Sequence, residues 1–161
     1  MNSESEICFA AESTLGKLAK WLRILGFDTS YKSDFSAKKA MDSGRKKRIL
    51  LTRTERVRDC KLSQGFIFIT SNNPFEQLRE VINTLGIVYT DTRPFSRCIR
   101  CNTRIKQVNK DSVQGNVPDF IWETRDIFRR CGRCRRIYWP GSHTERSHDI
   151  IMRLFDRHDK L

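Results

Sequence analysis

Two pairs of cysteines near the end of the chain have identical spacing and could bind a metal ion. Cys98 and Cys101 are separated by two residues, as are Cys131 and Cys134, and 29 residues lie between the pairs. A CxxC turn directs two thiolates at one ion about 2.3 Å away, and two such turns complete a tetrahedron. This spacing predicts a zinc ribbon in which the zinc is structural, because four thiolates leave no open coordination position.

Two other interpretations of the pairs are disulfides and a thioredoxin-like redox site. The first residues of the chain have neither a basic start nor a long apolar stretch, so we expect no secretory signal and a cytoplasmic location. In that compartment paired cysteines are more often metal ligands than disulfides. Neither pair lies within a βαβ pattern, which argues against a redox motif. Cys8 and Cys60 stand alone, and we interpret each as a small buried hydrophobe rather than a nucleophile.

Three single acids in the first half follow short apolar runs. Glu12 follows "ICFAA", Asp34 follows "FDTSYKS", and Glu55 follows "RILLTRT". In a parallel α/β sheet, ligands bind outside the carboxyl ends of the strands. Carboxylates gathered there bind Mg²⁺ or Mn²⁺, which activates water and neutralises charge on a phosphate. Acids at such positions are also typical of helix caps and solvated loops, so their spacing alone leaves both interpretations open.

Strand and helix patterns alternate through the first half of the chain. The sequence predicts strands at 7–11, 27–31, 48–52, 65–70 and 87–90, and helices that follow a cap at Ser13 or Thr14, at 35–44, and from Pro74 through Leu85. This alternation is typical of βαβ units and predicts a mainly parallel sheet flanked by helices.

The pattern changes near Pro94, where we place a domain boundary between residues 1–93 and 94–161. The second segment is rich in turns, contains both cysteine pairs, and ends in a predicted helix. Four apolar residues share one face of that helix: Ile150, Ile151, Leu154 and Phe155.

The chain is strongly basic, with a net charge of +12 over 161 residues. Residues 94–161 carry 15 Lys and Arg against 8 Asp and Glu, a larger excess than the 16 against 11 in residues 1–93. Such an excess favours an anionic partner, most commonly nucleic acid. No apolar run approaches the roughly 20 residues that a membrane helix needs, so we expect no membrane partner.

The stretch "RRCGRCRRIYW" concentrates arginines beside two aromatic residues. Arginine pairs with phosphates and aromatic rings stack on unpaired bases, so this stretch is a candidate RNA contact. Most of these candidates also have a structural interpretation: a solvated helix face for the lysines, packing of the ribbon for Tyr138 and Trp139, and a surface position for His143. His143 is also a candidate metal ligand, although four cysteines already suffice to bind one ion. The candidate RNA-binding residues are Lys17, Lys20, Arg129, Arg130, Arg133, Arg135, Arg136, Trp139 and His143.

Three blocks of the sequence closely resemble the mut-seven carboxy-terminal RNase domain family. They are "FAAESTLGKLAKWLRILGFDTSY", "RILLTR" and "FSRCIRCN…CGRCRRIYWPGSH", and the likeness runs from about Cys8 to His143 and somewhat beyond. The resemblance implies a PIN-like nuclease domain followed by a zinc ribbon, and a metal-dependent ribonuclease. It further implies that Glu12, Asp34 and Glu55 hold Mg²⁺ or Mn²⁺ as the catalytic acids.

The chain departs from the family pattern at two of the acids. The family has aspartate where this chain has Glu12 and again where it has Thr54, with Glu55 one residue later. A displacement of about 1 Å in a catalytic group can cost on the order of 10²-fold in rate. Two functions therefore stay open, a weakened ribonuclease and an RNA-binding protein that keeps the fold without the chemistry. A third candidate function is binding to an acidic protein. A protein with that function would not show salt-sensitive RNA binding, which separates it from the first two.

Overall fold

The computed structural model describes residues 6–31, 47–57 and 65–156. Contacts divide the chain into two compact units, Met1–Phe95 and Ser96–Leu161, which we call the N-terminal and C-terminal units. The helix predicted at 35–44 and the residues Asp34 and Cys60 lie outside the described ranges. Within those ranges, no helix has the length and apolar character needed to cross a membrane.

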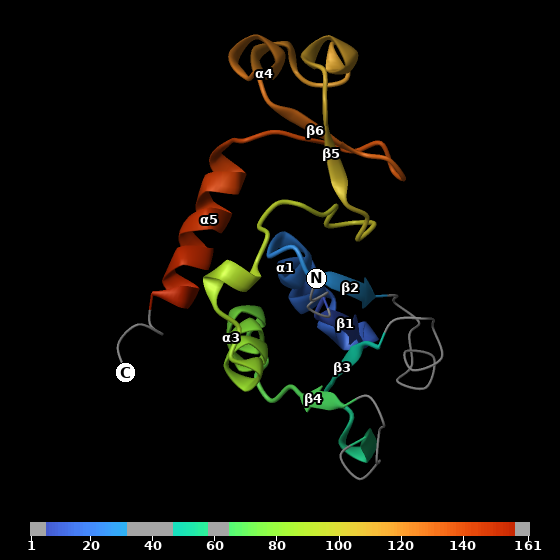
Figure 1. Ribbon diagram of the computed structural model, residues 1–161, viewed down its shortest axis with the longest axis vertical. Coiled ribbons are helices and arrows are strands. Elements are labelled where there is room, and N and C mark those ends of the chain that lie inside the picture. The colour runs from blue at the N-terminus through green and yellow to red at the C-terminus, as the bar shows by residue number, and fades with distance from the viewer. Residues whose placement is uncertain (1–5, 32–46, 58–64, 157–161) are drawn as a thin grey trace, which may run out of the picture. The chain divides into compact units, whose positions relative to one another are not determined.

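The N-terminal unit is built on a four-stranded sheet in which every neighbouring pair of strands is parallel (Figure 1). The strands are β1 (Cys8–Ala11), β2 (Asp28–Tyr31), β3 (Ile49–Thr52) and β4 (Phe66–Phe68), in the order β2-β1-β3-β4. All four residues of β1 are buried, as expected for a central strand. This sheet, with its helices, confirms the predicted α/β class.

Helix α1 (Gly16–Ile24) packs on β1 and β2 and against a second helix, α3. Its apolar residues recur every three or four positions, so Leu18 and Leu22 share one face and are both buried. Gly26 follows the helix with a φ of 95°, a conformation that glycine adopts without strain.

Helix α3 (Pro74–Leu85) begins and ends where the sequence predicts. The side chain of Asn73 accepts hydrogen bonds from the backbone N–H groups of Phe75 and Glu76, which have no partner within the helix. Proline in the first turn loses no helical hydrogen bond. Gly86, with a φ of 62°, terminates the helix in the left-handed conformation.

Two local predictions in the N-terminal unit are wrong. Neither Ser13 nor Thr14 caps α1, because a 3₁₀ turn at Ser13–Leu15 precedes the helix and its cap position carries no side-chain hydrogen bond. The strand predicted at 87–90 is instead a 3₁₀ turn at Tyr89–Asp91. There the Asp91 carboxylate accepts a hydrogen bond from the Val88 N–H at 2.9 Å, which closes the turn.

The C-terminal unit contains a three-stranded antiparallel sheet and two helices. The elements are β5 (Ile105–Val108), α4 (Asp119–Thr124), β6 (Phe128–Cys131), β7 (Ile137–Tyr138) and α5 (Ser142–Phe155). The sheet order is β5-β6-β7, and β6 pairs with both neighbours. On α5, Ile151, Leu154 and Phe155 are buried and Ile150 is half-buried, as the predicted apolar face requires.

The core of the ribbon itself is small. Val113, Val117 and Phe128 are its buried members, and partly buried side chains that include Trp122 and Trp139 pack around them. The rings of Phe128 and Trp139 lie with centroids 6.5 Å apart. So few buried side chains stabilise a fold weakly, which is why small domains of this size often depend on a bound metal.

Candidate metal centre and strand-end site

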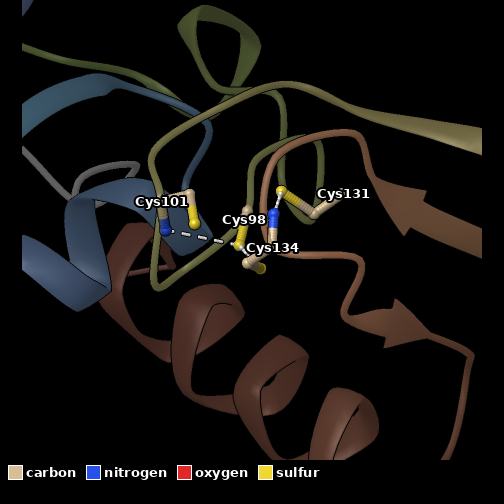
Figure 2. Close-up of side chains that lie close together, drawn as sticks. All are labelled: Cys98, Cys101, Cys131 and Cys134. Carbon is tan, nitrogen blue, oxygen red and sulfur yellow. Dashed lines mark hydrogen bonds between the residues drawn. The ribbon is translucent and has the colours of Figure 1, made fainter.

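Four cysteine side chains converge at one point in the C-terminal unit (Figure 2). The Sγ atoms of Cys98, Cys101, Cys131 and Cys134 all lie within 4.8 Å of one another, and all four cysteines are free thiols. Among the residues that the structure describes, this is the only group of three or more Cys, His, Asp or Glu side chains placed to hold one metal ion.

The two CxxC turns have the same hydrogen-bonding pattern. In the first, the N–H of Cys98 donates to the Thr103 carbonyl, and the N–H of Asn102 donates to the Cys98 carbonyl. In the second, Cys131 donates to the Arg136 carbonyl, and Arg135 donates to the Cys131 carbonyl. The two turns therefore have the same backbone arrangement. We call each a knuckle, from Cys98 to Thr103 in the first and from Cys131 to Arg136 in the second.

Each knuckle also directs a backbone N–H at its first sulfur. The N–H of Cys101 donates to Cys98 Sγ at 3.3 Å, and the N–H of Cys134 donates to Cys131 Sγ at 3.5 Å (Figure 2). Such bonds stabilise a thiolate, the form of cysteine that binds metals. The knuckles close on a left-handed residue, Asn102 or Arg135, each with a φ of 63°. For arginine this conformation costs roughly 1–2 kcal/mol, which the surrounding knuckle offsets.

The sulfur positions fit a tetrahedral zinc ion. With zinc–sulfur bonds of about 2.3 Å, the edge of a tetrahedron is about 3.8 Å, and the sulfurs of Cys98 and Cys134 are 3.7 Å apart. Burial raises the pKa of Cys98, but hydrogen bonds to its sulfur, chiefly from Tyr138, lower it to about 7. The hydrogen bond with Cys134 is the main cause that raises the pKa of Cys101 to about 12. Metal binding must displace protons from the cluster, so affinity should fall with decreasing pH.

Tyr138 supports the cluster from outside the four cysteines. Its hydroxyl donates to Cys98 Sγ at 3.0 Å, and burial together with this bond raises the pKa of Tyr138. The sequence suggested packing or RNA stacking for this residue. Its position next to Trp139 gave no indication of a contact with a sulfur 40 residues away in the sequence.

We expect Tyr138→Phe to weaken metal binding without unfolding the protein. The ring would still fill its site, but Cys98 Sγ would lose its hydroxyl donor, and loss of such a partner typically lowers metal affinity about 10–100-fold. Competition with a chromogenic chelator measures this affinity. Tyr89→Phe, at an exposed tyrosine in the N-terminal unit, is the matched control and should retain the wild-type value. Equal affinities for the two variants would contradict the assigned role of Tyr138.

Glu12 lies at the carboxyl end of β1 and is buried, with 7% of its surface exposed. Its carboxylate accepts four hydrogen bonds, two on each oxygen. Oε1 accepts from Thr14 Oγ1 and from the backbone N–H of Arg53, both at 2.9 Å. Oε2 accepts from Thr52 Oγ1 at 2.5 Å and Thr54 Oγ1 at 3.1 Å. We call these residues the Glu12 network, which joins the ends of β1 and β3.

The Glu12 network stabilises the ionised carboxylate. Burial alone would raise the pKa of Glu12, but the hydrogen bonds from Thr52, Arg53, Thr14 and Thr54 together hold it below its usual value. A carboxyl group with a lowered folded-state pKa contributes stability above the unfolded pKa, about 4.3 for glutamate. That contribution is lost as the pH falls through the folded-state pKa.

We therefore expect the stability difference between wild type and Glu12→Gln to depend on pH. At neutral pH the variant should be less stable by about 1–3 kcal/mol, because an amide cannot satisfy all four donors. On acidification the difference should shrink as the wild-type carboxylate protonates. Urea unfolding at a series of pH values measures both curves. A difference that stays constant down to the acid end would contradict the assigned network.

Of the two other acids predicted for this site, the structure describes only Glu55. Glu55 is exposed on a 3₁₀ turn, Glu55–Val57, that follows β3. Asp34 lies outside the described residues. The site does contain hydroxyl groups that sequence reasoning missed, at Thr14, Thr52 and Thr54. One acid near these strand ends was also not predicted: Glu80 of α3 accepts hydrogen bonds from the N–H groups of Thr70 and Ser71 after β4.

In the described part of the chain, hydrogen-bond donors occupy the positions at which the Glu12 carboxylate would bind a divalent cation. A carboxylate has about four lone-pair positions, and here each oxygen already accepts two hydrogen bonds. Thr54 offers this carboxylate a donor hydroxyl, not a second carboxylate that could share a cation with it. As arranged, the strand ends are held together by hydrogen bonds.

Charge is strongly segregated within the C-terminal unit. Residues 96–108 and 127–141, which contain both knuckles and the three strands, have nine Lys and Arg and no Asp or Glu. Residues 109–126, which include α4, have two basic and four acidic residues. Five exposed arginines lie on or next to the knuckles and form what we call the knuckle surface: Arg100, Arg104, Arg133, Arg135 and Arg136.

The remaining predicted RNA contacts lie in several surroundings. Lys17 and Lys20 are exposed on one face of α1, and His143 is exposed in the first turn of α5. Arg129 and Arg130 are half-buried on β6, where Arg130 Nη2 donates to the Ser112 carbonyl at 2.7 Å. Trp139 is half-buried because its ring packs beside Phe128 within the ribbon core. Packing is thus the alternative that the contacts of Trp139 favour.

The chain is an α/β protein in which a domain with a parallel sheet is followed by a ribbon with four converging cysteines. The model of the Mut7-C RNAse domain family matches residues 7–151, nearly the whole chain, and the chain belongs to this family. Membership indicates a nuclease-like or RNA-related function. No curated protein and no solved structure matches the chain significantly.

Proposed function

We propose that this chain binds RNA through the knuckle surface of its C-terminal unit, with zinc in the four-cysteine cluster as the structural support. The observation that carries the proposal is the charge segregation: both knuckles are rich in arginine and free of acids, whereas the segment around α4 is acidic. An acid-free basic surface attracts a phosphate backbone, and membership of an RNase family supports RNA as that backbone.

The knuckles present their arginines in a fixed arrangement. Arg100 and Arg133 each lie between the two cysteines of a knuckle, and Arg104 and Arg136 follow the knuckles on the way into β5 and β7. Because both knuckles converge on one cluster, a bound metal would hold these guanidinium groups near one another. Arginine binds phosphate in a bidentate manner, so such a preorganised group suits an RNA backbone.

The knuckle arginines have one structural alternative, because four thiolates around one Zn²⁺ carry a net negative charge. Arginines placed only to balance that charge would matter for metal affinity and not for RNA. The double variant Arg133→Gln/Arg136→Gln separates the two roles when zinc affinity and RNA affinity are both measured. Reduced zinc affinity with unchanged RNA affinity would contradict the proposal.

The test is the salt dependence of RNA binding by the zinc-loaded protein. Removing two phosphate contacts should reduce the slope of log affinity against log salt concentration by about 1.4 for single-stranded RNA. It should also weaken binding at low salt to all RNA sequences alike. Arg146→Gln/Arg153→Gln removes the same charge from exposed positions on α5 and is the matched control. Equal slopes for the two double variants would overturn the proposal.

A second candidate function is metal-dependent cleavage of RNA phosphodiester bonds, which the family match favours. In this case Asp34 and Glu55 would bind Mg²⁺ or Mn²⁺, and Glu12 would join them only where the metal displaces donors from the Glu12 network. Lys17 and Lys20 would contact the RNA backbone. The test is cleavage of labelled single-stranded and structured RNA in Mg²⁺, Mn²⁺ or EDTA by wild type and Asp34→Asn. Cleavage that needs the metal and is lost in the variant supports this function. Equal binding by both proteins without cleavage leaves RNA binding alone.

A further inference from the structure

The ends of β1 and β3 are joined through one buried carboxylate. Glu12 reaches from β1 to Thr52, the last residue of β3, and to the backbone N–H of Arg53 beyond it. The Thr54 N–H in turn donates to Thr52 Oγ1 at 3.0 Å, which fixes the orientation of that hydroxyl toward Glu12. The network therefore connects side chains and backbone at the ends of two strands, and the direction of the Thr52 hydroxyl is fixed from both sides.

Thr52 already has partners for its proton and for one of its two lone pairs. Its Oγ1 donates to Glu12 and accepts from the Thr54 N–H. Mg²⁺ requires near-octahedral oxygen ligands at about 2.0–2.1 Å, so it would have to displace at least one donor from Glu12. The displaced group, if it were the Arg53 N–H or the buried Thr52 hydroxyl, would lose its partner at the strand ends.

We propose that the Glu12 network replaces a cation at the strand ends, so that this chain takes up no Mg²⁺ or Mn²⁺ at Glu12. Thr54 is the residue that decides the outcome. Its hydroxyl donates to Glu12 Oε2, which is an attractive contact that needs no metal. A carboxylate at the same position would face Glu12 as a like charge, and two such groups are held together by a divalent cation. The inference goes beyond RNA binding, since it concerns the other unit.

The test measures Mn²⁺ uptake by the zinc-loaded full chain, by calorimetry and by loss of the free Mn²⁺ signal in electron paramagnetic resonance. Wild type should show no uptake that depends on Glu12. Thr54→Asp should gain a Mn²⁺ site. Thr54→Asn should not, because asparagine has nearly the same shape as aspartate but carries no charge. A second readout is thermal unfolding: Mn²⁺ at roughly 100 times its Kd should raise the Tm of Thr54→Asp by several degrees, and should leave the Tm of wild type unchanged.

Each outcome decides part of the inference. Mn²⁺ uptake by wild type that disappears in Glu12→Gln overturns it. Uptake that survives Glu12→Gln places the cation elsewhere and supports it. If Thr54→Asp folds but shows neither uptake nor a Tm shift, Thr54 is not the deciding residue and that assignment fails. Because none of these measurements uses RNA, their result is independent of whether the knuckle surface binds RNA.

Discussion

Removal of zinc from the four-cysteine cluster is expected to unfold the ribbon. The buried core around Phe128 is small, and both knuckles converge on the cluster, so the metal should supply much of the folding free energy. Structural zinc sites in small peptides contribute about 10–16 kcal/mol at neutral pH, which exceeds the net stability of most domains. Amide exchange should become fast in β5, β6 and β7 after chelation and slow again when zinc is restored.

Single substitutions make this expectation specific to the cluster. Cys131→Ser should lose stoichiometric zinc and expose the same amides. Cys8→Ser, at a buried cysteine of β1 outside the cluster, is the control and should retain one zinc per chain. The amides of β1 and β3 belong to the other unit and should stay protected after chelation. A ribbon that keeps slow exchange without metal would contradict the structural role of zinc.

Replacement of Arg48 should strongly destabilise the N-terminal unit. Arg48 Nη1 donates to Asp28 Oδ1 at 2.7 Å, to the Asp28 carbonyl at 3.2 Å and to the Phe9 carbonyl at 3.0 Å. The Arg48 and Asp28 side chains are only 15% and 10% exposed. Removing one partner of a buried ion pair costs about 3–5 kcal/mol, and Arg48→Met should lower the free energy of unfolding by that amount.

Two comparisons test the cause of the Arg48 effect. Arg79→Met breaks the exposed pair with Glu76 on α3 and should cost less than about 1 kcal/mol. Arg48→Met/Asp28→Leu removes both buried charges and should recover much of the loss, because no charge is left without its partner. Urea unfolding of the zinc-loaded variants measures all of these values. Equal losses for Arg48→Met and Arg79→Met would contradict the importance of burial.

Local patterns predicted most of the fold. The apolar runs at 7–11 and 48–52 became β1 and β3 because short buried strands need little beyond such a run and the turns around it. The cysteine cluster was predictable because CxxC spacing fixes the knuckle geometry within a few residues. The strand prediction at 87–90 failed because Asp91, one residue beyond the run, closes a turn onto Val88. A count of apolar residues does not reveal that a side chain will favour a turn over a strand.

The strand-end site was harder to predict because its chemistry depends on side-chain direction across strands. The sequence identified Glu12 as an acid at the end of a strand, which the structure shows, but not its partners. Thr52 and Thr54 are 40 and 42 residues away in sequence, and only strand pairing brings them to Glu12. The same holds for Tyr138, which reaches Cys98 from 40 residues away. Sequence spacing alone does not show which side chains of neighbouring strands meet.

The measurement to make first is NMR mapping of a short single-stranded RNA on the zinc-loaded protein in the absence of added Mg²⁺ or Mn²⁺. RNA binding by the knuckle surface predicts that the largest shifts occur at residues 98–104 and 131–136, and that they disappear as salt is raised. Shifts concentrated instead on α1 around Lys17 and Lys20, or an absence of shifts at low salt, would contradict RNA binding by the ribbon.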